Sequence, residues 1–193
     1  KPGLCAWNSS LKSHFCWPQE TEDPQAFKSV LAEWDRVLWQ VDAILEAGTH
    51  RRYVLGFSNG GYFAAYMAEH GLFPAQAYAI AGGGSLEPVQ KPSAAPPLLL
   101  VGAQEQPQED AARRPKLKEL HDGLAKAGWT HAYCTRPGPP PLATEDVEAA
   151  LRFFKHQQDG TLKASAEGYA CEGGATSLGG GLGAGDVAAA TTS

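Results

Sequence analysis

The chain has 193 residues, 43% of them apolar, and a formal net charge of −5 at pH 7. This length predicts one domain, and the apolar fraction is sufficient for a hydrophobic core. The negative charge argues against binding to nucleic acid, and the sequence contains no apolar run of the about 18 residues that would favour a membrane span.

The first predicted element is a long helix that follows an irregular segment at residues 1–22. Asp23 is expected to cap its N-terminus, Pro24 suits its first position, and Gly48 suits its end. Apolar residues recur at every third or fourth position, which is the spacing of an amphipathic helix. They are Phe27, Val30, Leu31, Trp34, Leu38, Val41 and Leu45.

Three short apolar segments come next and are predicted to be strands, at residues 52–57, 75–81 and 97–103. A helix at about residues 60–70 separates the first strand from the second. Their length and their Gly- and Pro-containing borders are typical of the buried strands of a parallel sheet.

A further helix and strand are predicted after residue 103. Pro115 suits the start of the helix, which carries Leu117, Leu120 and Leu124 and ends before Gly128. Residues 131–136 are then predicted to form a strand.

The last predicted helix begins at Thr144, which is expected to cap it. Glu145 and Asp146 lie in its first turn, where carboxylates suit the helix dipole. Its predicted buried stripe is Val147, Ala150, Leu151 and Phe154.

This order of elements predicts an α/β fold with a parallel sheet, about four strands of which are visible, flanked by helices on both faces. Residues 1–158 are expected to form this domain. Residues 159–193 are rich in Gly, Ala, Ser and Thr and have few large apolar side chains. Such a segment cannot bury enough surface to offset its ordering entropy, so we expect a disordered tail.

The residues Gly56-Phe57-Ser58-Asn59-Gly60 form a G-x-S-x-G pattern between a predicted strand and a predicted helix. In this turn the serine has a strained backbone, and the glycines avoid Cβ clashes. The turn would raise the Ser58 hydroxyl above the sheet and direct the Asn59 N–H toward an oxyanion. The pattern therefore predicts Ser58 as a catalytic nucleophile and the Asn59 backbone as an oxyanion donor.

With this motif the chain resembles the α/β-hydrolase superfamily, and within it the polyhydroxyalkanoate-depolymerase-like and dienelactone-hydrolase-like esterases. Residues 55–63, 97–104 and 145–154 carry the resemblance, which extends over residues 50 to 156. It implies a Ser–acid–His triad in that chain order. It also implies hydrolysis of a small ester or of a polyester segment.

The resemblance also implies three or four more strands before residues 52–57, where the chain has none. We therefore expect the C-terminal portion of such a hydrolase, in agreement with Lys1 in place of Met. The second oxyanion-hole donor would belong to the absent half. Strand 52–57 would keep an open edge, which predicts self-association.

The order of the elements indicates where the acid and the base of the triad would lie. Glu105 follows strand 97–103 and is the predicted acid, although the family usually has Asp there and a solvated loop carboxylate is the alternative. The family position of the histidine falls at about Pro140, which cannot accept a proton. Of the six histidines, only His14 precedes an element that begins near Ser58, so it is the remaining candidate for the base. The alternative is that His14 is a surface imidazole.

Two functions therefore stay open. One is a serine hydrolase that acts on carboxylic esters through Ser58. The other is a catalytically inactive, degenerate or truncated hydrolase fold that serves as a binding module, which Pro140 and the absent strands favour. A nucleotide-binding fold is disfavoured, because Gly82-Gly83-Gly84 lacks the G-x-G-x-x-G spacing.

The chain has four cysteines, at positions 5, 16, 134 and 171. Cys5 and Cys16 could form a disulfide in an oxidising compartment, and the alternative is four thiols in a reducing one. Between these, a secreted or periplasmic location is favoured. The sequence has no C-x-x-C pair, so neither a metal nor a cofactor is predicted.

Overall fold

The computed structural model describes residues 3–4, 15–18, 23–44, 51–85, 87–90, 95–103, 117–137, 142–158 and 170–174. A small antiparallel pair comes first, β1 (Gly3–Leu4) with β2 (Phe15–Cys16). The remaining elements are α1 (Pro24–Ile44), β3 (Tyr53–Phe57), α2 (Asn59–His70), β4 (Ala77–Ala81), β5 (Leu98–Ala103), α3 (Leu117–Ala127), β6 (His131–Arg136), α4 (Thr144–Gln158) and β7 (Ala170–Gly174).

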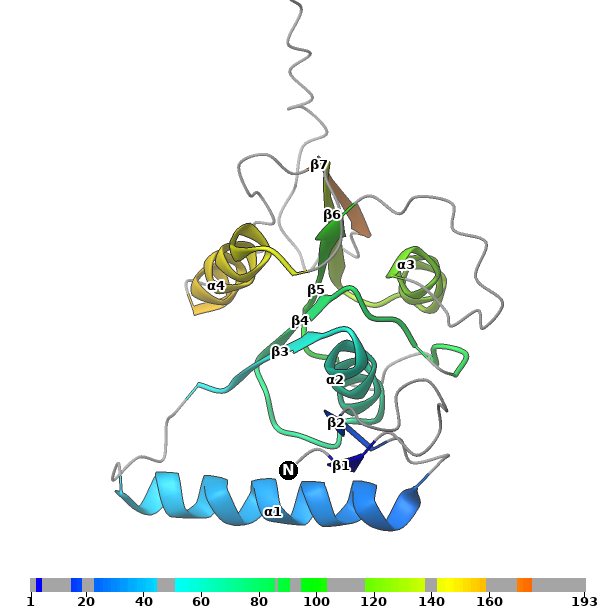
Figure 1. Ribbon diagram of the computed structural model, residues 1–193. Coiled ribbons are helices and arrows are strands. Elements are labelled where there is room, and N and C mark those ends of the chain that lie inside the picture. Colours follow the sequence, from blue (N-terminus) through cyan, green and yellow to red (C-terminus); the bar gives the residue numbers. More distant parts are fainter. Residues whose placement is uncertain are drawn as a thin grey trace, which may run out of the picture.

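The main sheet has five strands in the order β3-β4-β5-β6-β7. Strands β3 to β6 are parallel, and β7 is antiparallel to β6. Figure 1 shows α4 on one face of this sheet and α2 and α3 on the other, with α1 beyond β3. The chain therefore has an α/β fold, as the alternation of elements predicted, but the sheet is mixed because its fifth strand, β7, is antiparallel.

Local signals in the sequence fix most of the element ends. Asp23 caps α1, since its Oδ1 accepts a hydrogen bond from the Ala26 N–H at 2.9 Å. Gly71 and Gly128 follow α2 and α3 and have φ values of 61° and 80°, a left-handed conformation that glycine adopts readily. The helix expected from Pro115 begins at Leu117 in the structure.

Alternate side chains of each central strand enter two separate cores. In β4, Tyr78 and Ile80 join the core beneath α1, α2 and α3, whereas Ala77, Ala79 and Ala81 join the core beneath α4. All five are at most 2% exposed. This period-two division is the pattern of a strand that is covered on both faces.

The buried stripe of α4 differs from the prediction by about one position. Leu151 is 60% exposed, and the buried residues are Asp146, Ala149, Ala150, Phe153 and Phe154. The helix is rotated so that the Asp146 carboxylate reaches Arg136 inside the protein. The buried face of α4 therefore contains an ion-paired carboxylate as well as apolar residues, and the hydrophobic pattern alone does not include it.

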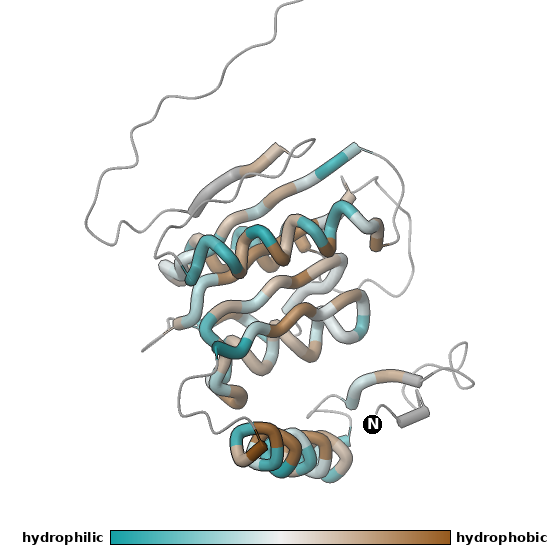
Figure 2. The backbone as a smooth tube through the Cα atoms, turned by 90° about the vertical axis from the view of Figure 1, so that its left-hand side faces the viewer, coloured by the Kyte–Doolittle hydropathy of each residue, from teal (hydrophilic) through white to brown (hydrophobic). Residues whose placement is uncertain are grey.

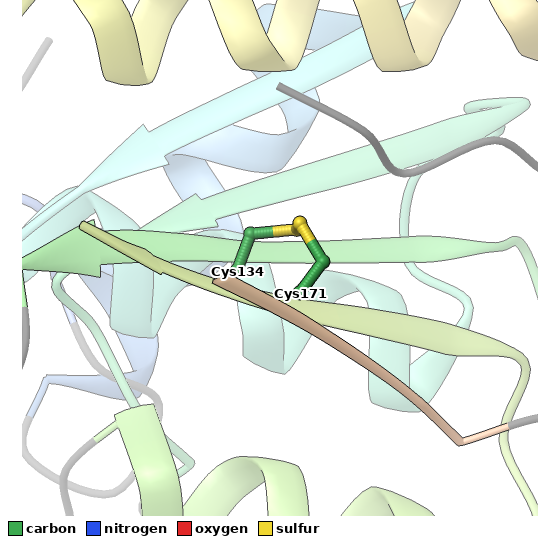
Figure 3. The surroundings of a disulfide bond; sticks show 2 residues. All are labelled: Cys134 and Cys171. Atoms are coloured by element: carbon green, nitrogen blue, oxygen red, sulfur yellow. A yellow bond between two sulfur atoms is a disulfide. The ribbon is translucent and has the colours of Figure 1, made fainter. Parts of the chain in front are cut away.

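The expectation of a disordered tail over residues 159–193 is wrong for Ala170–Gly174, which form β7. The other residues of that segment lie outside the described part of the chain. Cys134 of β6 faces Cys171 of β7 in register, and the two form a disulfide (Figure 3). The residues of this Gly-containing segment have a low propensity for strands, so the sequence did not predict one. Pairing with β6 and the disulfide to Cys134 order the segment as a strand.

Neither sequence alternative for the cysteines included the Cys134–Cys171 bond. Cys16 is also disulfide-bonded, and Cys5, its expected partner, lies outside the described residues. Disulfides persist in oxidising compartments. A secreted or periplasmic location stays the expectation.

Removal of the β6–β7 disulfide should weaken the fold measurably. The bond joins residues 37 positions apart, and a loop of that length predicts a loss of about 3–4 kcal/mol in the free energy of unfolding. Urea denaturation of Cys134→Ala/Cys171→Ser beside the wild type measures the loss. An unchanged denaturation midpoint would mean that the disulfide adds nothing to the stability of the sheet.

Large apolar side chains are exposed on the second half of α1 and on β3. Phe27 and Val30 are buried near the start of α1, whereas Trp39 is 73% and Ile44 77% exposed. In Figure 2, which views α1 nearly along its axis below the sheet, the tube of this helix contains both hydrophobic (brown) and hydrophilic (teal) residues. No described strand pairs with the outer edge of β3, so self-association there stays a prediction.

Among the described helices, none combines the length and the apolar character that crossing a membrane requires.

Candidate active site

Ser58 lies in the turn between β3 and α2 and has a strained backbone. Its φ is 51° and its ψ is −118°, and it is the one non-glycine residue with a positive φ in the described part of the chain. Such strain is worth about 1–3 kcal/mol and persists only where the surrounding structure enforces it. The strand, turn and helix that the G-x-S-x-G pattern predicted are therefore present around Ser58.

Neighbouring backbone fixes this turn. The Ser58 N–H donates to Ala81 O at 2.9 Å, and the Ser58 carbonyl accepts from the N–H groups of Gly61 at 2.9 Å and Tyr62 at 3.2 Å. On the other side, a Cβ atom at Gly56 would lie 2.3 Å from the carbonyl oxygen of Gly60. The turn closes only because position 56 has no side chain.

Asn59 is the first residue of α2, and its side chain is already engaged. Its Oδ1 accepts a hydrogen bond from the Trp17 N–H at 2.6 Å, and the Trp17 ring stacks on Phe63 at 5.2 Å. Its backbone N–H belongs to the first turn of the helix, where partial positive charge gathers. Ser58 immediately precedes α2, so it lies beside a helix end that favours an anion. Its hydroxyl makes no capping bond to the helix.

A cavity of about 340 Å³ adjoins Ser58. It lies at the carboxyl ends of β3, β4 and β5, which is where parallel sheets hold their ligands. Most of its lining is apolar, with Ser58 and Asp146 as its polar side chains. The lining residues are Phe57, Ser58, Ala81, Gly82, Val101, Gly102, Ala103, Leu142 and Asp146.

Asp146 reaches this cavity as half of a buried ion pair with Arg136. The guanidinium donates Nε–H to Oδ1 at 3.0 Å and Nη2–H to Oδ2 at 2.9 Å, and the Ala143 N–H also donates to Oδ2, at 2.8 Å. The two side chains are 12% and 2% exposed. The pair therefore ties the end of β6 to the first turn of α4 beside Ser58.

Sequence reasoning gave Asp146 only a role in the helix dipole and gave Arg136 none. The available signal was an arginine that ends the last predicted strand, followed ten positions later by an aspartate in the first turn of the next helix. In an α/β fold the two ends meet at the same edge of the sheet, so such a pair is a candidate for contact.

Of the predicted site residues, the structure brings Ser58 and Asn59 together at the start of α2. Glu105, Pro140 and His14 lie outside the described residues, so their predicted parts in the site stay predictions. The described histidines are His70, His121, His131 and His156, and none of them lines the cavity. Within the described residues, no three His, Cys, Asp or Glu side chains could hold a metal ion.

Two of these histidines form a buried pair at the opposite edge of the sheet. His121 Nδ1 and His131 Nε2 are 2.9 Å apart, and His131 Nδ1 lies 3.0 Å from the Trp129 carbonyl oxygen. His131 is paired in register with Leu98, the first residue of β5. The prediction that these two histidines lie away from Ser58 is therefore confirmed.

Tyr78 is a further buried polar residue near that edge. Its hydroxyl donates to the Phe73 carbonyl oxygen at 2.8 Å, and burial raises the pKa of Tyr78 above its ordinary range. Its ring belongs to the core beneath α2, so it has a packing role rather than a place in the cavity.

The chain matches no protein-family model and no curated protein, and its function therefore has to be inferred from the residues around Ser58.

Proposed function

We propose that this chain has an α/β-hydrolase-type fold and that Ser58 is the nucleophile of a carboxylic ester hydrolase. The observation that carries the proposal is the positive φ of Ser58 in a strand-to-helix turn at the edge of a cavity. Strained non-glycine residues gather at functional sites, because a fold keeps strain where it serves a purpose. This turn is also the one that serine hydrolases use to present their nucleophile.

In the proposed reaction the Ser58 hydroxyl oxygen attacks the ester carbonyl carbon and its proton passes to a base. The Asn59 N–H and the positive end of α2 stabilise the negative charge on the carbonyl oxygen. The C–O bond to the alcohol then breaks, the alcohol leaves with the proton, and water hydrolyses the acyl-serine. Glu105 remains the proposed acid that orients the base.

The cavity supports a small apolar acyl group as the substrate portion. Its volume of about 340 Å³ lies at the lower end of small-molecule sites, which hold about 300–1,000 Å³. Alanine, valine, leucine and phenylalanine contribute to its walls. A short-chain ester or one repeat of an aliphatic polyester suits these dimensions.

A second function, a binding module without catalysis, is favoured by one observation. None of the described residues that line the cavity is a histidine, and a serine hydroxyl without a base is a poor nucleophile near neutral pH. In that case the cavity would bind an ester or a related apolar ligand and leave it intact.

Hydrolysis of p-nitrophenyl butyrate by the wild type, Ser58→Ala and Ser29→Ala separates the two functions. Ser29 is an exposed residue on α1 whose hydroxyl bonds to the helix backbone, and it serves as the matched control. For a hydrolase we expect Ser58→Ala to lower kcat by at least about 100-fold and Ser29→Ala to leave it unchanged.

Equal turnover in the wild type and Ser58→Ala would exclude Ser58 as the nucleophile. If the wild type shows no turnover, NMR titration with the same ester tests the binding module. Shifts of the Ser58 and Gly82 amides that saturate would support binding without catalysis, and unchanged amides would exclude both functions for this cavity.

A further inference from the structure

The Ser85 hydroxyl lies at the centre of a buried polar cluster between α2 and the segment that follows β4. Ser85 Oγ is 2.8 Å from Glu69 Oε2 and 2.7 Å from the Glu87 carbonyl oxygen. It also accepts a hydrogen bond from the Glu87 N–H at 3.3 Å. Ser85 is 7% exposed, so water contributes little to these bonds.

A count of protons shows what this cluster requires. A hydroxyl has one proton to donate and two lone pairs with which to accept. Ser85 therefore cannot donate to the Glu69 carboxylate and to the Glu87 carbonyl at the same time. If Glu69 carries a proton on Oε2, it donates to Ser85 Oγ, Ser85 donates to the Glu87 carbonyl, and all three contacts become hydrogen bonds.

The other oxygen of Glu69 supports the same assignment. Glu69 Oε1 is buried and has no hydrogen-bond partner. In a protonated carboxyl group this atom is a neutral carbonyl oxygen, whereas in a carboxylate it shares the negative charge. Leaving a charged oxygen unpaired in the interior is far more unfavourable than leaving a neutral one.

The surroundings of Glu69 also favour its protonated form. Burial raises the pKa of Glu69 to about 7, and the nearby Glu87 carboxylate also raises this pKa. A hydrogen bond donated by Ser85 would lower it. Glu119 of α3 lines a cavity together with Ser85 and Glu87. Nε2 of His70 lies 3.6 Å from Glu87 Oε2, so the contact of this histidine is with Glu87.

We propose that Glu69 and Ser85 form a proton-dependent latch, closed when Glu69 is protonated, that holds residues 82–85 against α2. At its far end this segment reaches the candidate active site, because Gly82 lines the cavity beside Ser58. Between the two, Gly83 packs so closely on Gly61 that a Cβ at either position would meet the other's backbone within 3.0 Å. Release of Ser85 would therefore loosen one wall of that cavity.

The sign of the pH dependence follows from the raised pKa. An open latch exposes Glu69 and returns its pKa toward the ordinary 4.5, whereas the closed latch holds it near 7. The proton thus favours closure fully below pH 4.5. The stabilisation of the closed latch by the proton is lost as the pH rises toward 7. Above that pH the stability of the closed latch does not change further. The latch does not depend on Ser58 being a nucleophile.

The test is an NMR titration from pH 4 to 9 of the glutamate side-chain carboxyl carbons and the backbone amides. Glu69→Gln assigns the Glu69 signal, and its amide group can donate to Ser85 permanently. We expect a Glu69 midpoint near 7 and the same midpoint in the amides of residues 83–85. The amide transition should vanish in Glu69→Gln and persist in Glu148→Gln, an exposed carboxylate on α4.

Ser85→Ala then distinguishes the direction of the hydrogen bond. If Glu69 donates to Ser85, removal of the acceptor should lower the Glu69 midpoint. If Ser85 donates to a Glu69 carboxylate, its removal should raise the midpoint, and the latch is overturned. Amides of residues 83–85 that do not follow Glu69, or a Glu69 midpoint at its ordinary value, would overturn it equally.

Discussion

Asp146→Ala should lower the free energy of unfolding by about 3–5 kcal/mol, because it removes the buried carboxylate that accepts two hydrogen bonds from the Arg136 guanidinium. The two side chains are 12% and 2% exposed, so solvent screens little of the loss. The variant also removes the acceptor of the Ala143 N–H. Urea denaturation followed by circular dichroism measures the change.

Glu148→Ala is the matched control on the same helix. Glu148 forms an exposed pair with Arg152 one turn away, and such a pair is worth about 0.3–0.5 kcal/mol. In Arg136→Met/Asp146→Leu no charge remains buried, so this double variant should be more stable than Asp146→Ala. A loss in Asp146→Ala no larger than in Glu148→Ala would mean that the buried pair does not hold β6 to α4.

The elements that the sequence predicted well are those with local signals. Asp23 and Pro24 predicted the start of α1, and Gly128 ends α3 where the left-handed conformation is needed. The central strands β4 and β5 appear as short apolar segments, since each is covered on both faces. These features depend on residues close in sequence, so no knowledge of the fold was required to find them.

The features that the sequence did not predict depend on contacts between distant residues. β7 is a Gly-containing segment whose order comes from β6 and from the bond to Cys134. Leu151 fits the apolar stripe of α4 by spacing, yet it is exposed, whereas Asp146 turns inward toward Arg136. Neither outcome can be read from a segment alone, because the partner that decides it is many residues away.

The candidate site also contains residues that the sequence predicted and residues that it did not. Ser58 and Asn59 belong to one continuous turn, and the pattern of that turn was sufficient to predict its geometry. Asp146 enters the same cavity from α4, far along the chain, and no motif indicated it. A triad is assembled from distant loops in this manner, so its acid and base are intrinsically harder to predict than its nucleophile.

Gly56→Ala should destabilise the fold by about 3 kcal/mol, at the upper end of what overpacking usually produces. The new Cβ would lie 2.3 Å from Gly60 O and 2.6 Å from the Ala64 Cβ. Neither neighbour can withdraw, because Gly60 and Ala64 belong to the backbone and the buried face of α2. The turn would have to open, which should also remove any reactivity of Ser58.

Gly102→Ala is the control for this substitution, since Gly102 is a buried glycine in β5 at the same cavity. Its added Cβ would find the nearest atom, Leu117 Cδ2, at an ordinary 3.5 Å, so we expect a change of less than about 1 kcal/mol. Urea denaturation of both variants gives the comparison. If both lose the same stability, the close approach of β3 to α2 is not what fixes Ser58. If only Gly56→Ala is destabilised, the strained serine depends on the missing side chain two residues before it.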